Sequence, residues 1–193
     1  MKLLKTVQLI AVLCLCLSWQ SIHAQERPID ATRSKVTVHV GKAGLFSAAG
    51  HEHQVSAPIS QGSINESEPG RVWFRIDART LTVLPEKDQA EVQTTMQQKV
   101  LESEQFPEIR FQSTNIQKLA ADHWKIEGSL TLHGQTHPVV ADVRRVGMSY
   151  QGRSTIKQTD FGIRPVSVAG GTVKVKDELV IEFSIQPRQQ SRD

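Results

Sequence analysis

Apolar and polar residues alternate with a period of two along most of this chain. In four segments the apolar side chains take every second position between charged or hydroxyl-bearing neighbours: 35–40, 71–77, 124–132 and 178–185. Because successive side chains of a strand point to opposite faces, this alternation predicts β-strands with one buried face and one exposed face. Less regular apolar stretches predict further strands near 55–64, 109–116, 138–146, 152–159 and 171–176. Turn-forming residues separate the strands at Glu66–Gly70 and Val168–Gly171.

One segment, Lys87–Glu104, breaks this period. It contains no glycine or proline, and Val92, Met96 and Val100 stand at helical spacing, which predicts a helix of about three to four turns. Its apolar stripe is expected to pack on the rim of the sheet, either as a gate for a ligand or as a structural cap. Pro107 cannot continue the helix and is expected to precede the next strand. Many short strands with one helix predict an all-β barrel or sandwich.

The start of the chain has the pattern of a secretory signal. Lys2 and Lys5 precede the apolar run Leu9–Trp19, and Ser21–Ala24 provides a cleavage site. The apolar run is shorter than the roughly 20 residues that cross a bilayer as a helix. We therefore expect export to the periplasm or out of the cell, with cleavage near Ala24, and a single domain over residues 25–193.

Cysteine content and charge then exclude several classes of function. Cys14 and Cys16 both lie in the leader, so the mature domain is expected to have no disulfide, thiol nucleophile or thiolate metal site. The leader carries two of the 23 basic residues and none of the 20 acidic ones, so the mature domain is within one charge of neutrality. It shows no basic stripe interleaved with aromatic residues, so nucleic acid is not an expected partner.

Five segments, in this order, resemble the YceI-like family of exported lipocalin-like proteins. They cover nearly the whole mature chain and are residues 34–41, 106–113, 128–139, 159–163 and 176–185. The resemblance implies an eight-stranded antiparallel lipocalin-like barrel with one helix across an opening. It also implies an elongated apolar cavity that holds an isoprenoid or fatty-acyl chain.

Phenylalanines at apolar positions are the candidates for the wall of such a cavity. Phe111 and Phe183 share parity with aliphatic neighbours and are expected to face inward. Aromatic residues make up only 5% of the chain, so the lining is expected to be mainly aliphatic. The residues that we assign to the cavity are Phe74, Phe111, Leu130, Phe161 and Phe183.

Histidines suggest an alternative function. His51 and His53 would project from one face of a strand roughly 6–7 Å apart, and His133 or His137 is the candidate third ligand, with His39 behind them. Three neutral imidazoles would suit a divalent zinc, copper or nickel ion. The other interpretation is structural: polar residues at the end of a barrel, and a hairpin turn at His133 in which Gly134 adopts positive φ.

The segment Gly50–His53 also departs from the more apolar stretch that many YceI-like proteins carry there. No nucleophile elbow, phosphate-binding loop or dinucleotide fingerprint is present in the sequence, so an enzyme is not expected. The sequence therefore favours an exported carrier of a long-chain lipid or isoprenoid. The alternatives are a metal-binding protein and a structural or stress-linked protein without a ligand. The oligomeric state stays open, a homodimer included.

Overall fold

The computed structural model describes residues 26–43, 53–84, 89–168 and 173–189. These residues form one antiparallel sheet and one short helix, so the predicted all-β antiparallel class is confirmed. Eleven strands follow one another by hydrogen bonding, and β11 (Ser167–Val168) pairs only with β12. In the order of the sheet the eleven are β1 (Glu26–Pro28), β4 (Ile59–Asn65), β5 (Arg71–Asp77), β7 (Glu108–Ala120), β8 (His123–Leu132), β9 (Gln135–Val146), β10 (Ser149–Lys157), β12 (Val173–Ile185), β2 (Lys35–Ala43), β3 (His53–Ser56) and β6 (Thr82–Leu84).

The expected barrel of eight strands is wrong, because the structure has a curled, half-barrel sheet in which eleven strands follow one another. The stretch predicted as one strand at 55–64 is divided into β3 and β4 around Pro58, which has no N–H to donate to a ladder. A 3-10 turn at Ala78–Thr80 separates β5 from β6 in the same way. Of the segment predicted at 171–176, the described residues 173–176 belong to the long strand β12, which has an irregularity between Val175 and Leu179.

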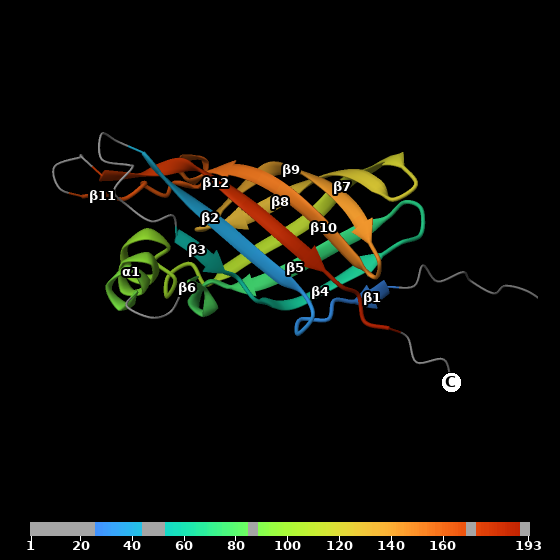
Figure 1. Ribbon diagram of the computed structural model, residues 1–193, viewed down its shortest axis with the longest axis horizontal. Helices are drawn as coiled ribbons and strands as arrows, with labels where there is room; N and C mark the ends of the chain where they lie inside the picture. The colour runs from blue at the N-terminus through green and yellow to red at the C-terminus, as the bar shows by residue number, and fades with distance from the viewer. Residues whose placement is uncertain (1–25, 44–52, 85–88, 169–172, 190–193) are drawn as a thin grey trace, which may run out of the picture.

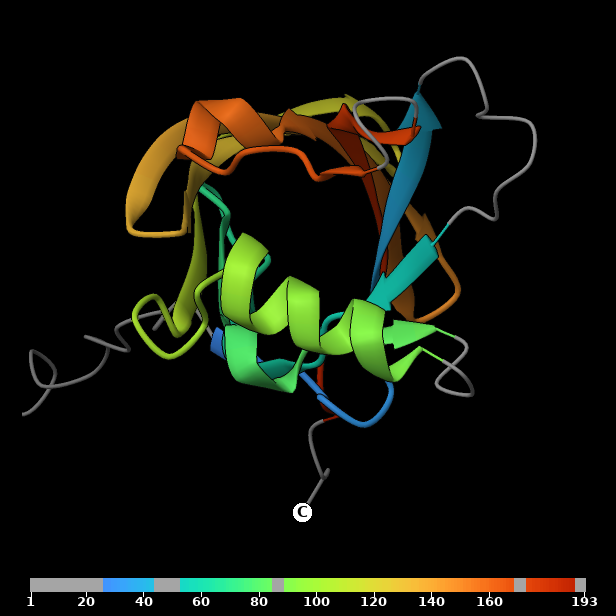
Figure 2. The ribbon, with the colours of Figure 1, turned by 90° about the vertical axis from the view of Figure 1, so that its left-hand side faces the viewer.

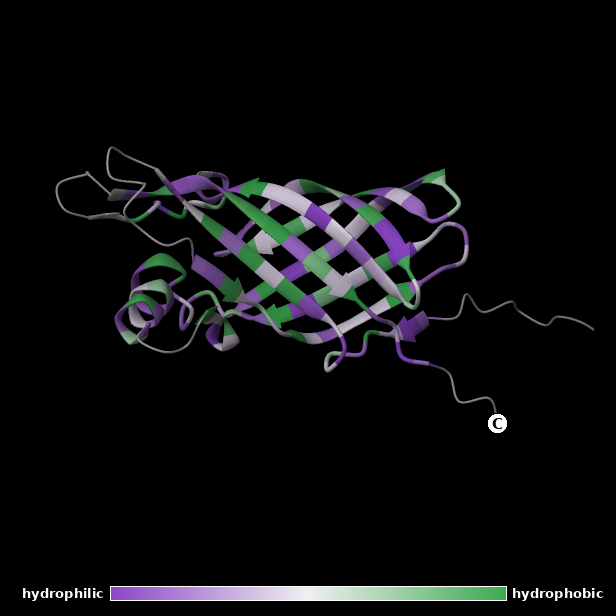
Figure 3. Cartoon of the chain, viewed as in Figure 1, coloured by the Kyte–Doolittle hydropathy of each residue, from purple (hydrophilic) through white to green (hydrophobic). Residues whose placement is uncertain are grey.

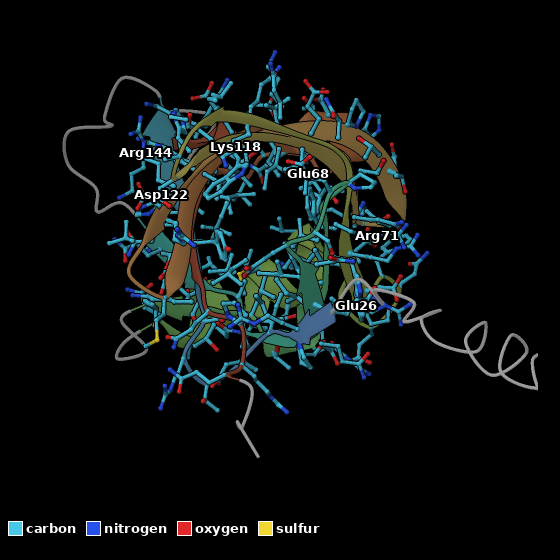
Figure 4. All side chains as sticks on the ribbon, turned by 90° about the vertical axis from the view of Figure 1, so that its right-hand side faces the viewer. Glu26, Glu68, Arg71, Lys118, Asp122 and Arg144 are labelled. Carbon is cyan, nitrogen blue, oxygen red and sulfur yellow. The ribbon has the colours of Figure 1, made fainter. Side chains whose placement is uncertain are left out.

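The sheet curls around its own inner face, as the views along the long axis show (Figures 2 and 4). β12 lies between β10 and β2, and β2 then pairs with β3. At the other end of the path, the residue after β1 meets the segment that follows β12: Ile29 bridges Pro187, and Arg188 N–H donates to Pro28 O at 2.7 Å. This curl makes the inner face concave and directs one parity of every strand toward a common interior.

The alternation in the sequence matches the two faces of the sheet. In β5, Val72 and Ile76 are buried, whereas Arg71 and Arg75 are exposed. Figure 3 shows the same banding along the long strands, with apolar and polar residues in succession. Burial of the apolar parity, at about 25 cal/mol per Å² removed from water, is the main force that holds the sheet curled.

The predicted helix is present but shorter than expected. α1 (Ala90–Thr95) continues as a π-helical turn over Met96–Val100, and the chain then turns at Glu102, which has a φ of 44°. Met96 and Val100 pack against the buried core, as the stripe predicts, but Val92 is 36% exposed. None of the helices among the described residues is long and apolar enough to cross a membrane.

Two glutamines, rather than the apolar stripe alone, fix the helix to the edge of the sheet. Gln93 Oε1 accepts from Val83 N–H at 2.8 Å, and Gln93 Nε2 donates to Leu81 O at 2.8 Å. Gln97 Nε2 donates to the carbonyls of Ala78 and Leu81 at 3.1 and 3.0 Å. The helix therefore supplies hydrogen bonds to β6, the last strand on the path, where no further strand follows.

We expect Gln93→Ala to lower the free energy of unfolding by about 1–2 kcal/mol, because the Val83 N–H and the Leu81 carbonyl would lose their partner. Chemical denaturation followed by far-UV circular dichroism measures this difference. Gln98→Ala on the exposed side of the same helix is the control and is expected to change stability by less than about 0.5 kcal/mol. Equal losses in the two variants would contradict a specific contribution of the Gln93 hydrogen bonds.

Candidate functional site

The inner face of the curled sheet encloses a cavity of about 850 Å³. This volume lies within the range of small-molecule sites in proteins. Most of its wall consists of apolar side chains that point inward from successive strands. They are Val36, Ile64, Val72, Phe74, Phe111, Ile116, Trp124, Ile126, Leu130, Val139, Ala141, Val143, Ile156, Ile181, Phe183 and Ile185.

Four of the five residues assigned to a cavity from the sequence are in this wall. Phe74 and Phe111 are cross-strand neighbours of β5 and β7, and their rings stack with centroids 5.3 Å apart. Leu130 lies opposite Phe111 on β8, and Phe183 lies on β12. Phe161 is not in the wall, although it is buried. It belongs to a 3-10 turn (Gln158–Phe161) beyond the end of β10, where strand parity does not determine the direction of a side chain.

Glycines on the neighbouring strands, beneath two of these phenylalanine rings, let the rings lie flat on the wall. A Cβ atom on Gly152 would be 2.4 Å from Phe183 Cζ, and one on Gly128 would be 2.5 Å from Phe111 Cζ. Both glycines are in the middle of strands, where glycine is otherwise unfavourable. The close approach of each ring to the backbone leaves room in the centre of the sheet.

The cavity opens at one end of the sheet, which we call the mouth. There its lining changes from buried apolar residues to exposed and charged ones. Figure 4 looks into this end, with Glu68, Arg71 and Lys118 around the opening. The lining residues of the mouth are Asn65, Glu66, Ser67, Glu68, Pro69, Gly70, Arg71, Lys118, Ala121, Arg145 and Tyr150.

Tyr150 is a half-buried polar group at this mouth. Its ring packs edge-on against Trp124, with centroids 5.7 Å apart, and its hydroxyl hydrogen-bonds the Glu66 carboxylate. Glu66 in turn pairs with Arg27 at 2.8 Å. Burial, and then the hydrogen bond with Glu66 and its negative charge, raise the pKa of Tyr150 to about 12. The hydroxyl therefore stays neutral and acts as a hydrogen-bond donor beside the opening.

We expect an ultraviolet titration of the folded protein to give a tyrosine midpoint near pH 12. Tyr150 is the single tyrosine of the chain, so the phenolate absorbance reports this residue alone. Because the folded pKa exceeds the unfolded value of about 10, the stabilising contribution is complete below pH 10 and is lost as the pH rises toward 12. The control is the same titration in denaturant, which should return the midpoint to about 10. A midpoint near 10 in the native protein would show that the hydroxyl is not held in this environment.

Figure 2 shows α1 lying across part of the opposite end of the curled sheet. Buried side chains fill the interior of this half. This end holds a cluster of buried residues that are absent from the cavity wall: Val55, Ala57, Ile59, Ile76, Ala78, Leu81, Val83, Ile109, Leu132, Phe161 and Ile163. No residue of α1 or of the π-helical turn is in the wall. Of the two roles left open by the sequence, the helix therefore has the position of a structural cap, because the cavity opens at the other end.

Two of the candidate histidines, His133 and His137, lie at the filled end of the sheet. His133 and Gly134 form the two-residue turn between β8 and β9, with φ values of 51° and 72°, as the hairpin interpretation predicts. His133 links three segments: Nδ1 is 3.2 Å from the Phe161 carbonyl oxygen, Nε2 is 3.0 Å from Glu102 Oε2, and its ring contacts Phe106. His137 packs edge-on against Phe161.

The structure does not bring the described histidines together as ligands. His53 is in β3, opposite Val40, and His39 pairs with Glu182 at 3.1 Å. His51 lies outside the described residues, so the proposed pair with His53 has no described geometry. Within the described part of the chain, no group of three His, Cys, Asp or Glu side chains could hold a metal ion.

Several residues of the site are not among those assigned to the cavity from the sequence. Trp124 and Ile126 share the parity of Leu130 and could have been assigned to the wall on that ground. Strand parity does not identify Tyr150, Glu66 or Arg27 as residues of the site. They come from strands that are distant in sequence and meet only in the folded protein.

The comparison with known proteins agrees with this geometry. The family model of the YceI-like domain matches residues 28–187. No curated protein shows significant similarity to the chain.

Solved structures of low sequence identity share the fold. A polyisoprenoid binding domain from Saccharophagus degradans, implicated in plant cell wall breakdown, is 13% identical with a TM-score of 0.57, over 86% of this chain and 100% of that one. BcnA of Burkholderia cenocepacia is 18% identical with a TM-score of 0.53, over 81% and 98%. A YceI protein of Campylobacter jejuni is 15% identical with a TM-score of 0.54, over 67% and 81%.

Proposed function

This chain belongs to the YceI-like domain family, and on that premise we propose that it is an exported carrier whose cavity binds one long-chain apolar ligand of the polyisoprenoid or fatty-acyl class. The observation that carries the proposal is the wall of the cavity. Behind the mouth, Ser154 is the one described lining residue with a hydroxyl, and it donates to the Val140 carbonyl at 2.8 Å. The depth of the cavity therefore offers a ligand contacts with carbon and no free side-chain hydroxyl.

Such a wall favours ligands that have no polar groups along most of their length. A polar molecule would lose its hydrogen bonds to water in this space and regain few of them, at a cost of about 1–3 kcal/mol per group. A hydrocarbon chain gains roughly 0.8 kcal/mol for each CH₂ group buried. The charged and hydroxyl-bearing mouth would then hold the polar end of the same molecule. The arrangement fits reversible binding of a lipid chain rather than a reaction.

The same proposal includes export. The expected product is a mature chain that begins close to Gln25, and it lies in the periplasm or outside the cell. N-terminal sequencing of protein from the native host tests this directly, and a chain beginning at Met1 would contradict it.

Filling the cavity tests the binding function. Ala141 lines the cavity, whereas its neighbour Val140 faces outward and is 48% exposed. We expect Ala141→Trp to remove most retention of a radiolabelled polyprenol, because the indole would occupy the space of the chain. The change in the free energy of unfolding is expected to stay within about 1–3 kcal/mol.

Val140→Trp is the matched control, since it adds the same side chain one residue away on the opposite face. It should retain polyprenol as the wild type does. Native mass spectrometry of the wild-type protein, with palmitate offered in competition, distinguishes an isoprenoid from a fatty-acyl ligand. Equal retention by the two tryptophan variants, or no retained lipid in the wild type, would refute a carrier function.

A further inference from the structure

Most of the large apolar side chains that are exposed lie around the mouth of the cavity. The described residues include five large hydrophobic side chains that are exposed: Val92, Leu119, Val140, Val146 and Met148. Three of the five are at the tips of two hairpins at this end of the molecule. Leu119 is 49% exposed near the β7–β8 turn, and Val146 and Met148 are 54% and 57% exposed at the β9–β10 turn.

The two hairpin tips are neighbours beside the opening. Arg145 N–H donates to the Asp122 carbonyl at 3.0 Å, and Arg145 Nη2 lies 2.7 Å from Asp122 Oδ1. Figure 4 shows Asp122 and Arg144 close together on this part of the rim. Lys118, Ala121 and Arg145 from the same tips also line the cavity. The exposed apolar residues therefore adjoin the opening through which a ligand must pass.

Basic residues accompany the apolar ones on both tips. Lys118 precedes Leu119, and Arg144 and Arg145 precede Val146. Two nearby acidic groups are already paired, Asp122 with Arg145, and Asp142 with His123 at 2.6 Å and with Arg144 at 3.8 Å. Lys118 has no ion pair with any residue that the structure describes. Lys118 is therefore free to meet an anionic surface, whereas Arg144 and Arg145 each have an aspartate partner.

From this arrangement we infer that the β7–β8 and β9–β10 tips dock the mouth of the cavity on the surface of a lipid bilayer. The inference rests on the proposed carrier function. Apolar side chains flanked by lysine and arginine are the composition of segments that lie in the interface of a membrane, where the cations contact phosphate groups. A ligand chain can then pass between bilayer and cavity without being exposed to water, which removes the largest barrier to its transfer.

A bilayer fits the patch better than a second protein does. The patch has three large apolar residues on two neighbouring turns, which is too few to form the apolar core of a stable protein interface. Projecting turns can enter the headgroup region one by one. An interface between two copies of this chain is therefore the outcome that the test must exclude.

Co-sedimentation with vesicles of phosphatidylcholine and phosphatidylglycerol tests the inference. A variant carrying Leu119→Ser, Val146→Ser and Met148→Ser is expected to bind these vesicles at least about tenfold more weakly than the wild type. The rate of polyprenol transfer from vesicle to protein should fall in parallel. The control variant, Val92→Ser with Val140→Ser, removes exposed apolar side chains outside the two hairpin tips and should behave as the wild type does.

Polyprenol delivered in cyclodextrin, without any bilayer, distinguishes this inference from the carrier function. Equal capacity of the wild type and the triple variant under these conditions, together with slower transfer from vesicles, supports docking. Retention by a wild type that does not bind vesicles overturns docking and leaves the carrier function intact, whereas no retention by any route refutes the carrier function. A wild type that is dimeric by light scattering, with a monomeric triple variant, would assign the patch to a protein interface instead.

Discussion

Replacing Phe161 by alanine is expected to lower the free energy of unfolding by about 3–5 kcal/mol, the usual range for a buried phenylalanine. Phe161 is 1% exposed and belongs to the filled end of the sheet, outside the cavity wall. Its ring packs against His137, and its carbonyl lies 3.2 Å from His133 Nδ1. Removing the ring creates a new void among well-packed neighbours, so the loss includes a cavity term as well as a transfer term.

The matched comparison is Phe183→Ala in the wall of the existing cavity. Phe183 is only partly buried and already faces empty space, so its removal enlarges a cavity instead of creating one, and the expected loss is roughly half as large. Polyprenol retention should change in the opposite order, falling in Phe183→Ala and staying near the wild-type level in Phe161→Ala under conditions where both are folded. Urea denaturation and a retention assay on the same samples measure both quantities. Equal effects of the two substitutions would show that the filled and open halves are not distinct.

The difference between Phe161 and Phe183 also shows which inward-facing side chains can be predicted from the sequence. Alternation along β5, β7, β8 and β12 was sufficient to direct Phe74, Phe111, Leu130 and Phe183 inward, because parity within a strand is a local property. Phe161 was assigned with them, yet it falls in a 3-10 turn, where the period of two does not apply. The sequence predicts that Phe161 is buried, but it does not predict whether Phe161 lies in the filled half or in the open half of the interior.

Features that depend on contacts between distant strands cannot be predicted from the alternation of residues in the sequence. The interruption of the strands at Pro58 and at Ala78–Thr80 changes their number without changing their alternation. The position of the mouth follows from which hairpins meet at that end, so the helix could be predicted as a segment but not placed relative to the opening. Gln93 stands in a polar segment and gives no sign that it hydrogen-bonds the edge of β6.

Gly152→Val is expected to destabilise the protein by about 3 kcal/mol or more and to reduce polyprenol retention at the same time. A Cβ atom at this position would be 2.4 Å from Phe183 Cζ and 2.5 Å from the Asp142 carbonyl oxygen. The first contact can be relieved only by turning the Phe183 ring into the cavity. The second is with the backbone of β9, which is paired to β10 and can shift only by distorting that ladder. Overpacking of this kind typically costs 1–3 kcal/mol even for smaller additions.

Gly41→Ala is the control, because it also adds a side chain within a strand. The nearest atom to its Cβ is Cδ of Lys176, at 3.0 Å, and this belongs to a flexible, exposed side chain that can move aside. Its effect is expected to stay within about 0.5 kcal/mol, with retention unchanged. If Gly152→Val proved as harmless as Gly41→Ala, the Phe183 ring would not lie flat on the backbone, and the open space in the sheet would need a different cause. The expected result instead ties the cavity to two glycines, Gly128 and Gly152, whose missing side chains leave space for the aromatic rings and thereby for the ligand.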